Sequence, residues 1–215
     1  MHRPRPLLLG HRGASKYAPE NTAAAFDLAL RHGCDGFELD VRYTRDSRCV
    51  ICHNAFHRRR RISARLFPDL DLPSAEDVIR TYTNRAFLDI ELKVPGEAGP
   101  ILKALRDANP DKFVISSFLP TVLQVVRDAD PSIPLGLICE NLRQFRKWES
   151  LPVSMVIVEK KLATRALIDE LHAAGKQVLV WTVNRKAQML RFAELGVDGL
   201  ISDDTRLLAD TLSKH

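Results

Sequence analysis

Residues 7–41 read LLLGHRGASKYAPENTAAAFDLALRHGCDGFELDV, and this stretch holds the pattern that decides the fold. A short apolar run at Leu7–Leu9 is followed by an amphipathic segment over Asn21–His32 and by a second apolar run at Gly36–Val41. Apolar runs bounded by turn residues predict buried strands, and the amphipathic segment predicts a helix packed against them. The stretch therefore predicts one strand, helix, strand unit.

The same alternation continues along the rest of the chain. Further strands are expected at Ala86–Leu92, Phe113–Ser116, Leu135–Ile138, Val153–Val158, Val178–Trp181 and Gly199–Ile201. Further helices are expected at Ala75–Tyr82, Ala98–Ala108, Pro120–Ala129, Leu142–Trp148, Thr164–Ala174, Lys186–Leu195 and Asp204–Leu212. Such alternation predicts a parallel sheet with right-handed crossovers, and eight units favour closure into an α/β fold of the (β/α)8 TIM-type barrel class. The competing open sheet would carry a G-x-G-x-x-G loop after the first strand, where residues 10–13 read GHRG.

Length and composition indicate one globular domain over residues 1–215. With 45% hydrophobic residues and only 10 glycines and 12 prolines, the chain is neither collagen-like nor disordered. No apolar stretch approaches the roughly 20 residues of a membrane span, and Leu7–Leu9 is too short for a signal-peptide core. We therefore expect a cytoplasmic protein without a transmembrane segment. A length at the small end of barrel size leaves room for only a short insertion between the second and third strands.

The positive charge of the chain is modest and partly local. Its 32 Lys and Arg residues against 27 Asp and Glu give a formal charge of +5. Residues 57–61 read HRRRR, a run typical of a solvated loop, with contact to a phosphate-bearing substrate or surface as the alternative. Nucleic acid is the weaker explanation of this small excess, and an anionic small molecule is the better one.

The segment Cys49-Val-Ile-Cys52-His53 matches C-x-x-C-H, a pattern of haem attachment that also contains the C-x-x-C of redox and zinc sites. Haem attachment of this kind follows export, zinc would need a second ligand pair, and a redox pair normally opens a helix. Here the segment follows a turn, as a short strand would. We therefore expect Cys49 and Cys52 to be buried, reduced thiols on opposite faces, which leaves His53 free for another role.

Carboxylates gather at the expected carboxyl ends of the strands, where barrel enzymes place their chemistry. Residues two apart in a strand share a face, so Glu38 projects with Asp40, and Glu91 projects with Lys93. Three hard oxygen ligands without a cysteine suit Mg²⁺ or Ca²⁺ better than zinc. The alternative is structural ion pairing of Glu38 or Asp40 with Arg12 or Lys93. Because such residues crowd one end of the fold, we favour a metal site.

Two histidines, His11 and His53, also follow strands at this end. Beside a divalent metal they fit phosphodiester cleavage, one taking a proton from the nucleophile and the other giving one to the leaving alkoxide. Arg12 and Lys93 supply the positive charge that would bind phosphate. The remaining histidines are expected to be structural: His2, His32, His57, His172 and His215.

Residues 10–54 closely resemble the opening of the glycerophosphodiester phosphodiesterase family, with an HRG turn, a PENT turn, an E-x-D strand and a short strand ending in histidine. Similar pieces follow in order: LPSAEDVI at 72–79, LDIELK at 88–93, SSF at 116–118, VWTVN at 180–184 and GVDGLISDD at 196–204. The resemblance implies a TIM-type barrel and metal-dependent hydrolysis of glycerophosphodiesters to glycerol 3-phosphate and an alcohol. It also implies attack by the substrate's own glycerol hydroxyl, through a cyclic phosphate that water then opens.

Carried over by position, the resemblance assigns the same residues that the chemistry suggests. The histidine pair falls on His11 and His53, the metal carboxylates on Glu38, Asp40 and Glu91, and the phosphate-binding residues on Arg12 and Lys93. Glu20 is expected to pair with Arg12 or to lie near the metal, and Asn21 or Thr22 to cap the following helix. Trp181 is expected to wall the pocket or to be a buried barrel tryptophan.

Three departures from the family leave alternatives open. Asn54 stands where the family usually has Asp, the segment after His53 is shorter than the family's lid, and ISDD replaces an Ile-Thr-Asp ending while keeping Asp203. A shorter lid predicts a more open site, which suits a larger phosphodiester such as a lysophospholipid or a phosphate polymer. Asn54 motivates a third possibility, a non-catalytic barrel that binds a metal or phosphate ester. The sequence indicates no oligomeric state.

Overall fold

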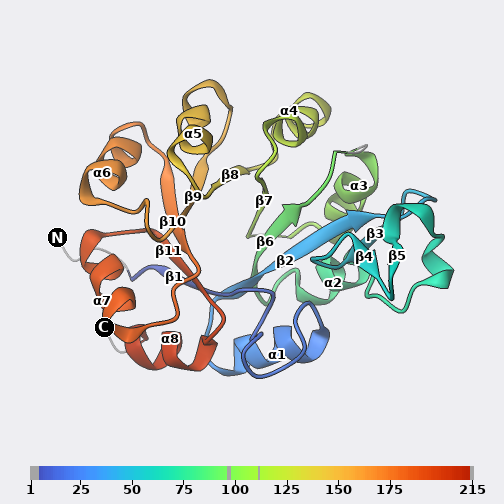
Figure 1. Cartoon of the computed structure of the whole chain (residues 1–215), viewed down its shortest axis with the longest axis horizontal. Helices are drawn as coiled ribbons and strands as arrows, with labels where there is room; N and C mark the ends of the chain where they lie inside the picture. The colour runs from blue at the N-terminus through green and yellow to red at the C-terminus, as the bar shows by residue number, and fades with distance from the viewer. Residues whose placement is uncertain (1–4, 96–97, 111, 214–215) are drawn as a thin grey trace.

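A computed structural model of the chain describes residues 5–95, 98–110 and 112–213. Within these residues eight parallel strands form a closed barrel, which confirms the predicted (β/α)8 architecture (Figure 1). The barrel strands are β1 (Leu7–Gly10), β2 (Gly36–Tyr43), β6 (Phe87–Leu92), β7 (Phe113–Ser117), β8 (Leu135–Cys139), β9 (Met155–Glu159), β10 (Gln177–Trp181) and β11 (Gly199–Ser202). Because β1 pairs with both β11 and β2, the first and last strands of the chain lie side by side.

In the described part of the chain, eight α-helices surround the barrel (Figure 1). They are α1 (Ala23–Arg31), α2 (Ala75–Tyr82), α3 (Gly99–Ala108), α4 (Pro120–Ala129), α5 (Leu142–Phe145), α6 (Arg165–Ala173), α7 (Lys186–Leu195) and α8 (Thr205–Leu212). Most expected bounds agree within two residues. The exception is α5, which ends at Phe145 and continues as 3-10 turns over Arg146–Ser150. None of these helices is long and apolar enough to cross a bilayer.

The core has two layers because alternate residues of each strand face opposite sides of the sheet. On the outer side, Phe37 of β2 stacks on Phe26 of α1 with ring centroids 4.1 Å apart, and Tyr82 of α2 packs edge-on against both. The barrel interior is filled by a separate apolar cluster: Leu9, Val114, Ile138, Met155, Ile157, Leu179 and Ile201. Along each strand, side chains therefore alternate between the surrounding helices and the barrel interior.

The expected insertion lies between β2 and β6. It begins with β3 (Cys49–Ile51), which pairs antiparallel with β2, and continues as a hairpin of β4 (Phe56–His57) and β5 (Arg60–Arg61). Figure 1 shows the hairpin beside the barrel rather than over its centre. Buried Val50, Ile62 and Leu70 form a small apolar cluster that packs the segment after the hairpin against β3.

All four cysteines fall in the described ranges, and each is a free thiol. Cys49 is buried, as expected, and burial raises its pKa to about 12. The expectation of burial is wrong for Cys52, which lies beyond the end of β3 and is half-buried, although burial still raises its pKa. Thiols with raised pKa values are poor nucleophiles and poor metal ligands at neutral pH, which argues against a redox or metal role for Cys49 and Cys52.

Candidate active site at the carboxyl ends of the strands

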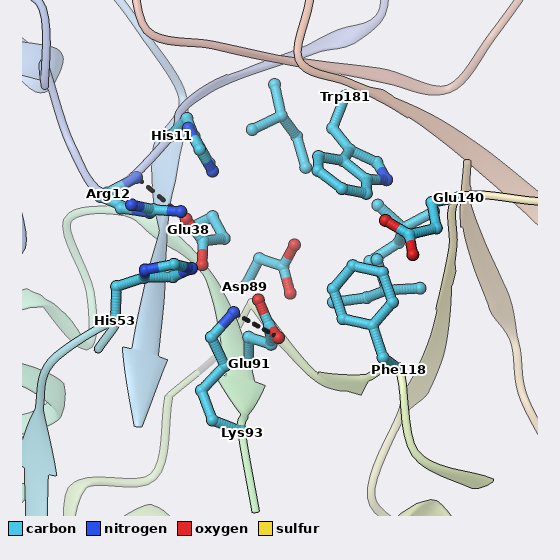
Figure 2. Close-up of a pocket in the computed structure, with 13 residues that line it drawn as sticks. His11, Arg12, Glu38, His53, Asp89, Glu91, Lys93, Phe118, Glu140 and Trp181 are labelled. Atoms are coloured by element: carbon cyan, nitrogen blue, oxygen red, sulfur yellow. Dashed lines mark hydrogen bonds and ion pairs between the residues drawn. The ribbon is translucent and has the colours of Figure 1, made fainter. Parts of the chain in front are cut away.

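A pocket with a cavity volume of about 220 Å³ opens at the carboxyl ends of the barrel strands (Figure 2). Its lining residues are His11, Arg12, Glu38, His53, Asp89, Glu91, Lys93, Phe118, Ile138, Glu140, Ile157, Trp181 and Ile201. The lining includes seven of the eight candidate site residues from the sequence. The eighth, Asp40, is 1% exposed and is paired in register with Glu91 on the neighbouring strand. Figure 2 shows His11, Arg12, Glu38, His53 and Lys93 on one side of the pocket and Phe118, Trp181 and Glu140 on the other.

Glu38, Asp40 and Glu91 form a compact acidic cluster, with one carboxylate oxygen of each within 4.8 Å of the others. The strand register creates this cluster, because β2 and β6 run side by side with Glu38 opposite Asp89 and Asp40 opposite Glu91. Glu38 Oε2 accepts a hydrogen bond from the Arg12 backbone N–H at 2.9 Å. Its buried Oε1 has no hydrogen-bond partner among the described residues. Such an oxygen is suited to bind a metal ion. The oxygen-only donor set fits a divalent cation such as Mg²⁺ or Ca²⁺.

The pKa values in the cluster separate according to the nearest charges. Burial, reinforced by Asp40 and Glu91, raises the pKa of Glu38 well above its usual range. Burial also raises the pKa of Glu91, even though Lys93 opposes it. Burial acts the same way on Asp40, but Lys93 and Arg12 outweigh it and lower the pKa of that carboxyl. Asp40 therefore ionises most readily of the three, and a cation bound by all three would favour their ionised forms.

Lys93 and Arg12 supply positive charge at the edge of this cluster. Lys93 Nζ lies 3.0 Å from Asp40 Oδ1 and 2.7 Å from Glu91 Oε1. Burial disfavours the charged amine, but Glu91 and Asp40 outweigh it and raise the pKa of Lys93. Arg12 Nε lies 3.2 Å from Asp40 Oδ2, and its Nη1 lies 2.9 Å from Glu20 Oε2. Among the residues that the structure describes, the ion pairs considered from the sequence are thus present for Asp40 but not for Glu38.

The HRG turn after β1 owes its shape to backbone geometry. Arg12 and Gly13 both have left-handed φ values, +55° and +81°. A Cβ atom added to Gly13 would lie 2.6 Å from the carbonyl carbon of Ala25, so only glycine fits against α1. This close approach turns the Arg12 N–H toward Glu38 and the His11 ring toward the pocket (Figure 2).

The PENT segment supports the cluster in a way that the sequence left open. Thr22 is the residue that caps α1, because its side chain accepts a hydrogen bond from the Ala25 N–H. Asn21 instead contacts Asp40 twice: Nδ2 donates to Asp40 Oδ2 at 2.7 Å, and Oδ1 accepts from the Asp40 N–H at 3.2 Å. Glu20 pairs with Arg12, the first of its two expected roles. Asn21 therefore orients a carboxylate of the cluster rather than a helix end.

His11 is held by the carboxylate of Asp203, whose Oδ1 lies 2.7 Å from His11 Nδ1. Asp203 also accepts hydrogen bonds from Ser15 and Asn184. Burial would raise the pKa of Asp203, but the bonds from His11 and Asn184 outweigh it and lower that pKa to about 2. An ionised acceptor at this position places the proton of His11 on Nδ1 and leaves Nε2 free for a substrate.

His53 has a different environment. Its Nδ1 lies 3.3 Å from Asn54 Oδ1, a neutral partner. Its backbone carbonyl accepts hydrogen bonds from Nε and Nη2 of Arg42, at 2.9 and 2.6 Å, which fix the segment after β3. Burial lowers the pKa of His53. The two histidines, both facing the pocket in Figure 2, thus differ in the charge of the group behind the ring.

The opposite wall combines aromatic rings with one carboxylate. Trp181 lies on this wall at the end of β10, where the sequence suggested that it would line a pocket. Phe118 and Glu140, which the sequence did not single out for this role, are the first residues after β7 and β8. Parallel barrel strands direct such residues to the mouth, so position after a strand was the signal that could have found them.

Of the histidines expected to be structural, His32 contacts Thr205 with its Nδ1 2.8 Å from the hydroxyl, and His172 contacts Asp198 with its Nε2 2.9 Å from the carboxylate. His57 lies in β4, outside the pocket lining. His2 and His215 lie outside the described residues.

Comparisons with known proteins show the family to which the chain belongs. Residues 11–74 and 82–207 match the Glycerophosphoryl diester phosphodiesterase family. The chain is 28% identical to a glycerophosphodiester phosphodiesterase of Caldanaerobacter subterraneus over 98% of its own length and 99% of that protein. These matches define a phosphoric diester hydrolase built on a (β/α)8 barrel. Within that class, the chain belongs to the glycerophosphoryl diester phosphodiesterase family.

Solved structures share the fold. A phosphodiesterase of Oleispira antarctica, in complex with the product sn-glycerol-3-phosphate, superposes with a TM-score of 0.85 and 24% identity, covering 96% of each chain. A glycerophosphodiester phosphodiesterase of Thermotoga maritima gives a TM-score of 0.82 and 22% identity, over 97% of this chain and 99% of its own. At these identities the likeness concerns the barrel architecture.

Proposed function

We propose that the protein hydrolyses glycerophosphodiesters to glycerol 3-phosphate and an alcohol with the help of a divalent cation. The observation that carries the proposal is the pair of differently held histidines facing one pocket beside the acidic cluster. General acid and base groups on two sides of a phosphoryl group are what displacement of an alcohol from a phosphodiester requires.

The environments of the two histidines suggest their roles. The carboxylate of Asp203 holds His11 through Nδ1 and leaves Nε2 facing the pocket, which suits His11 to give a proton to the leaving alkoxide. His53 faces neutral Asn54 and has a pKa lowered by burial, which suits it to take the proton from the attacking hydroxyl. The oxygen of the substrate's glycerol hydroxyl forms a bond to phosphorus as the bond from phosphorus to the departing alcohol oxygen breaks; His53 takes the proton of the hydroxyl, and His11 gives one to the alcohol. Water then opens the cyclic phosphate to glycerol 3-phosphate, with His11 taking a proton from the water and His53 returning one to the ring oxygen that leaves.

Glu38, Asp40 and Glu91 would hold the cation, and Arg12 and Lys93 would bind the phosphoryl oxygens. A cation there would neutralise the charge that develops on the phosphoryl group. Arg12 remains charged throughout, and the raised pKa of Lys93 keeps its amine positive. These two residues therefore attract an anionic substrate over the pH range in which the histidines exchange protons.

The proposal also concerns the domain that carries out the reaction, its cellular compartment and its product. We propose a single unit over residues 1–215, acting on a small molecule in the cytoplasm. Free thiols at Cys34, Cys49, Cys52 and Cys139 support a reducing compartment. The product bound by the Oleispira antarctica protein supports glycerol 3-phosphate as one product here. The release of glycerol 3-phosphate by this protein would be a step in the breakdown of lipid-derived diesters.

A second candidate substrate class is favoured by the hairpin. Arg58–Arg61 are all exposed, the turn residues Arg58 and Arg59 have left-handed φ values of +48° and +64°, and Phe56 beside them is 52% exposed. These φ values are what the two-residue turn of a hairpin requires, so the turn presents the arginine side chains to solvent. A lysophospholipid in an anionic lipid surface would suit this basic, partly aromatic tip. Arg59→Ser with Arg60→Ser should then slow hydrolysis of lysophospholipids and leave glycerophosphocholine turnover unchanged.

The direct test measures glycerol 3-phosphate released from glycerophosphocholine or glycerophosphoethanolamine with Mg²⁺, with Ca²⁺ and after chelation. We expect activity that needs a cation and that falls about 10²- to 10⁴-fold in His11→Ala and in His53→Ala. His172→Ala is the matched control, because His172 contacts Asp198 away from the pocket. Activity that survives chelation or both substitutions would contradict the mechanism. Absence of turnover with tight phosphate-ester binding would instead support the non-catalytic alternative.

A further inference from the structure

We propose that the insertion between β2 and β6 binds the protein to an anionic lipid membrane, through the exposed arginines of its hairpin and the aromatic ring beside them. The inference goes beyond the proposed function, because it concerns a surface on which the whole protein lies and not the diester that the pocket cleaves. The hairpin lies beside the barrel in Figure 1, and its residues do not line the pocket.

The positive charge of the chain is concentrated in this insertion. Residues 44–65 hold one acidic residue, Asp46, against seven arginines: Arg45, Arg48, Arg58, Arg59, Arg60, Arg61 and Arg65. This excess is larger than the formal charge of +5 on the whole chain, so the remaining residues are together slightly acidic. Basic residues near a membrane are attracted to acidic lipids, and the attraction grows with their number. An anionic surface therefore approaches the protein most favourably on the side of the insertion.

Most of the hairpin arginines are free to contact such a surface. Arg59, Arg60 and Arg61 are exposed, and they make no ion pair within the part of the chain that the structure describes. Arg58 lies 3.0 Å from a carboxylate oxygen of Asp71, but both side chains are largely exposed, and such a pair is weak in water. Free guanidinium groups bind phosphate oxygens through pairs of parallel hydrogen bonds. The tip can thus contact several lipid phosphates at once.

An exposed phenylalanine accompanies these charges. Phe56 is 52% exposed, and in the hairpin register it lies opposite Arg61, whose guanidinium carbon lies 5.3 Å from the centre of the ring. An apolar side chain exposed to water is stabilised when it enters the interface between lipid headgroups and acyl chains, where aromatic residues are enriched. The ring therefore adds an attraction that salt does not screen.

Nucleic acid also attracts arginines and aromatic rings, but the other exposed apolar side chains favour lipid. Among the described residues, four large hydrophobic side chains are exposed: Tyr17, Phe56, Val125 and Leu142. All except Val125 lie in segments that follow β1, β3 and β8, and each of these segments also contributes a residue to the pocket lining. A bilayer offers an apolar phase to the 61% exposed side chain of Leu142, and a polynucleotide does not.

The hairpin is fixed beside the pocket. The Ile62 N–H donates to the Ala55 carbonyl oxygen at 3.0 Å across the base of the hairpin, and Ile62 belongs to the buried cluster that contains Val50 of β3. His53, two residues before Ala55, faces the pocket. A hairpin fixed in this way loses little conformational freedom when it binds a surface. Binding would bring the end of the barrel that carries the pocket close to the membrane.

The test measures binding to sedimented vesicles, which does not depend on activity. Vesicles of phosphatidylcholine alone are compared with vesicles that contain about one third phosphatidylglycerol, at low and at raised salt. We expect an apparent Kd at least about tenfold lower on the anionic vesicles, and a smaller difference as salt rises.

Two variants separate the charges from the ring. Arg59→Gln with Arg60→Gln should raise Kd for anionic vesicles about tenfold or more, and Phe56→Ser should raise it about threefold or more. Arg106→Gln with Arg191→Gln is the matched control, because it removes the same charge from two exposed arginines on α3 and α7. The control should change Kd by less than about twofold.

Equal Kd values on the two kinds of vesicle, an equal loss in the hairpin variant and its control, or unchanged binding in Phe56→Ser would overturn the proposal. Tighter binding to a single-stranded oligonucleotide, at the same salt and phosphate concentration, would assign the surface to nucleic acid and overturn it as well. Release of glycerol 3-phosphate from glycerophosphocholine in solution should be unchanged in every variant. If the unaltered protein does not hydrolyse glycerophosphocholine, the proposed function fails, and the vesicle measurement still decides membrane binding.

Discussion

Asp203 Oδ1 lies 2.7 Å from His11 Nδ1, across 192 positions of sequence. The contact exists because β1 and β11 are neighbours in the closed barrel, with Gly10 opposite Ser202 in the strand register. His53, the other histidine of the pocket, has the neutral Asn54 in the corresponding position behind its ring. The two imidazoles therefore differ in the charge of their partners, and this difference can be tested by changing either partner.

Asp203→Asn should remove the charge that orients and stabilises the His11 ring while keeping its hydrogen-bonding shape. We expect kcat to fall about 10²-fold or more, because an amide can favour the wrong tautomer of the imidazole. The measurement is steady-state kinetics over a range of pH. Asp210→Asn removes the same charge from the exposed surface of α8 and should have little effect. A kcat within twofold of the unaltered protein would contradict the assigned role of Asp203.

Asn54→Asp should place a carboxylate beside His53 and raise the pKa of that imidazole, which burial now lowers. If His53 takes a proton in the reaction, the acidic limb of the kcat/KM profile moves to higher pH, and activity at mildly acidic pH falls. The profile should be recorded with saturating cation. An acidic limb that stays in place, or moves to lower pH, would show that His53 is not the base.

Divalent cation binding should stabilise the folded protein. At a concentration about 100 times Kd, a ligand adds about 2.7 kcal/mol to the free energy of unfolding, which raises Tm by roughly 5–10 °C for a chain of this length. Thermal unfolding with Mg²⁺, with Ca²⁺ and with chelator measures the shift. Glu38→Gln should abolish it, and Glu149→Gln, an exposed glutamate far along the chain, should not. An undiminished shift in Glu38→Gln would place the cation elsewhere.

The metal-free protein should lose stability as pH rises through the titration of Asp89. Burial raises the pKa of this fully buried carboxyl from 3.8 to about 7, so the folded state binds its proton more tightly than the unfolded state does. Between these two pH values the folded state carries more protons, and the free energy of unfolding therefore falls as pH rises.

Asp89→Asn should remove this dependence. Asparagine keeps an oxygen that can accept the hydrogen bond from Ser116 Oγ, so we expect a gain of about 4 kcal/mol at pH 8 and well under about 1 kcal/mol at pH 4. Denaturant unfolding in chelator at both pH values measures it. A gain of the same size at pH 4 would show that charge is not the cause.

Much of the fold follows from patterns that are local in sequence. The run at Leu7–Leu9 and the alternation at Gly36–Val41 predict their strands, and the parity of β2 alone puts Glu38 and Asp40 on the inner face. Where the local signal is weak, prediction is less accurate: the segment after Leu142 was expected to form one helix, but it turns into 3-10 geometry after Phe145.

The candidate site likewise contains some residues that the sequence could identify and others that it could not. Residue type and strand parity were sufficient to identify His11, His53 and the acidic cluster. The role of Asn21 was not identifiable, because a residue beside a helix start is usually a cap, and only the left-handed backbone at Asn21 turns its amide to Asp40. Burial of Cys52 was predicted wrongly, because β3 ends one residue before it.

By itself, the sequence determined the order of strands and helices, the inward direction of the carboxylates and the family to which the chain is similar. These properties depend on residues within a few positions of one another, so the local pattern of apolar and polar residues is sufficient to predict them. Only the tertiary structure decided that Asp203 lies behind His11, that Lys93 reaches Asp40 on the neighbouring strand, and that Glu140 joins Phe118 and Trp181 on the opposite wall. These contacts join residues distant in sequence or on different strands, and their geometry exists only once the barrel closes and sets the register of its strands.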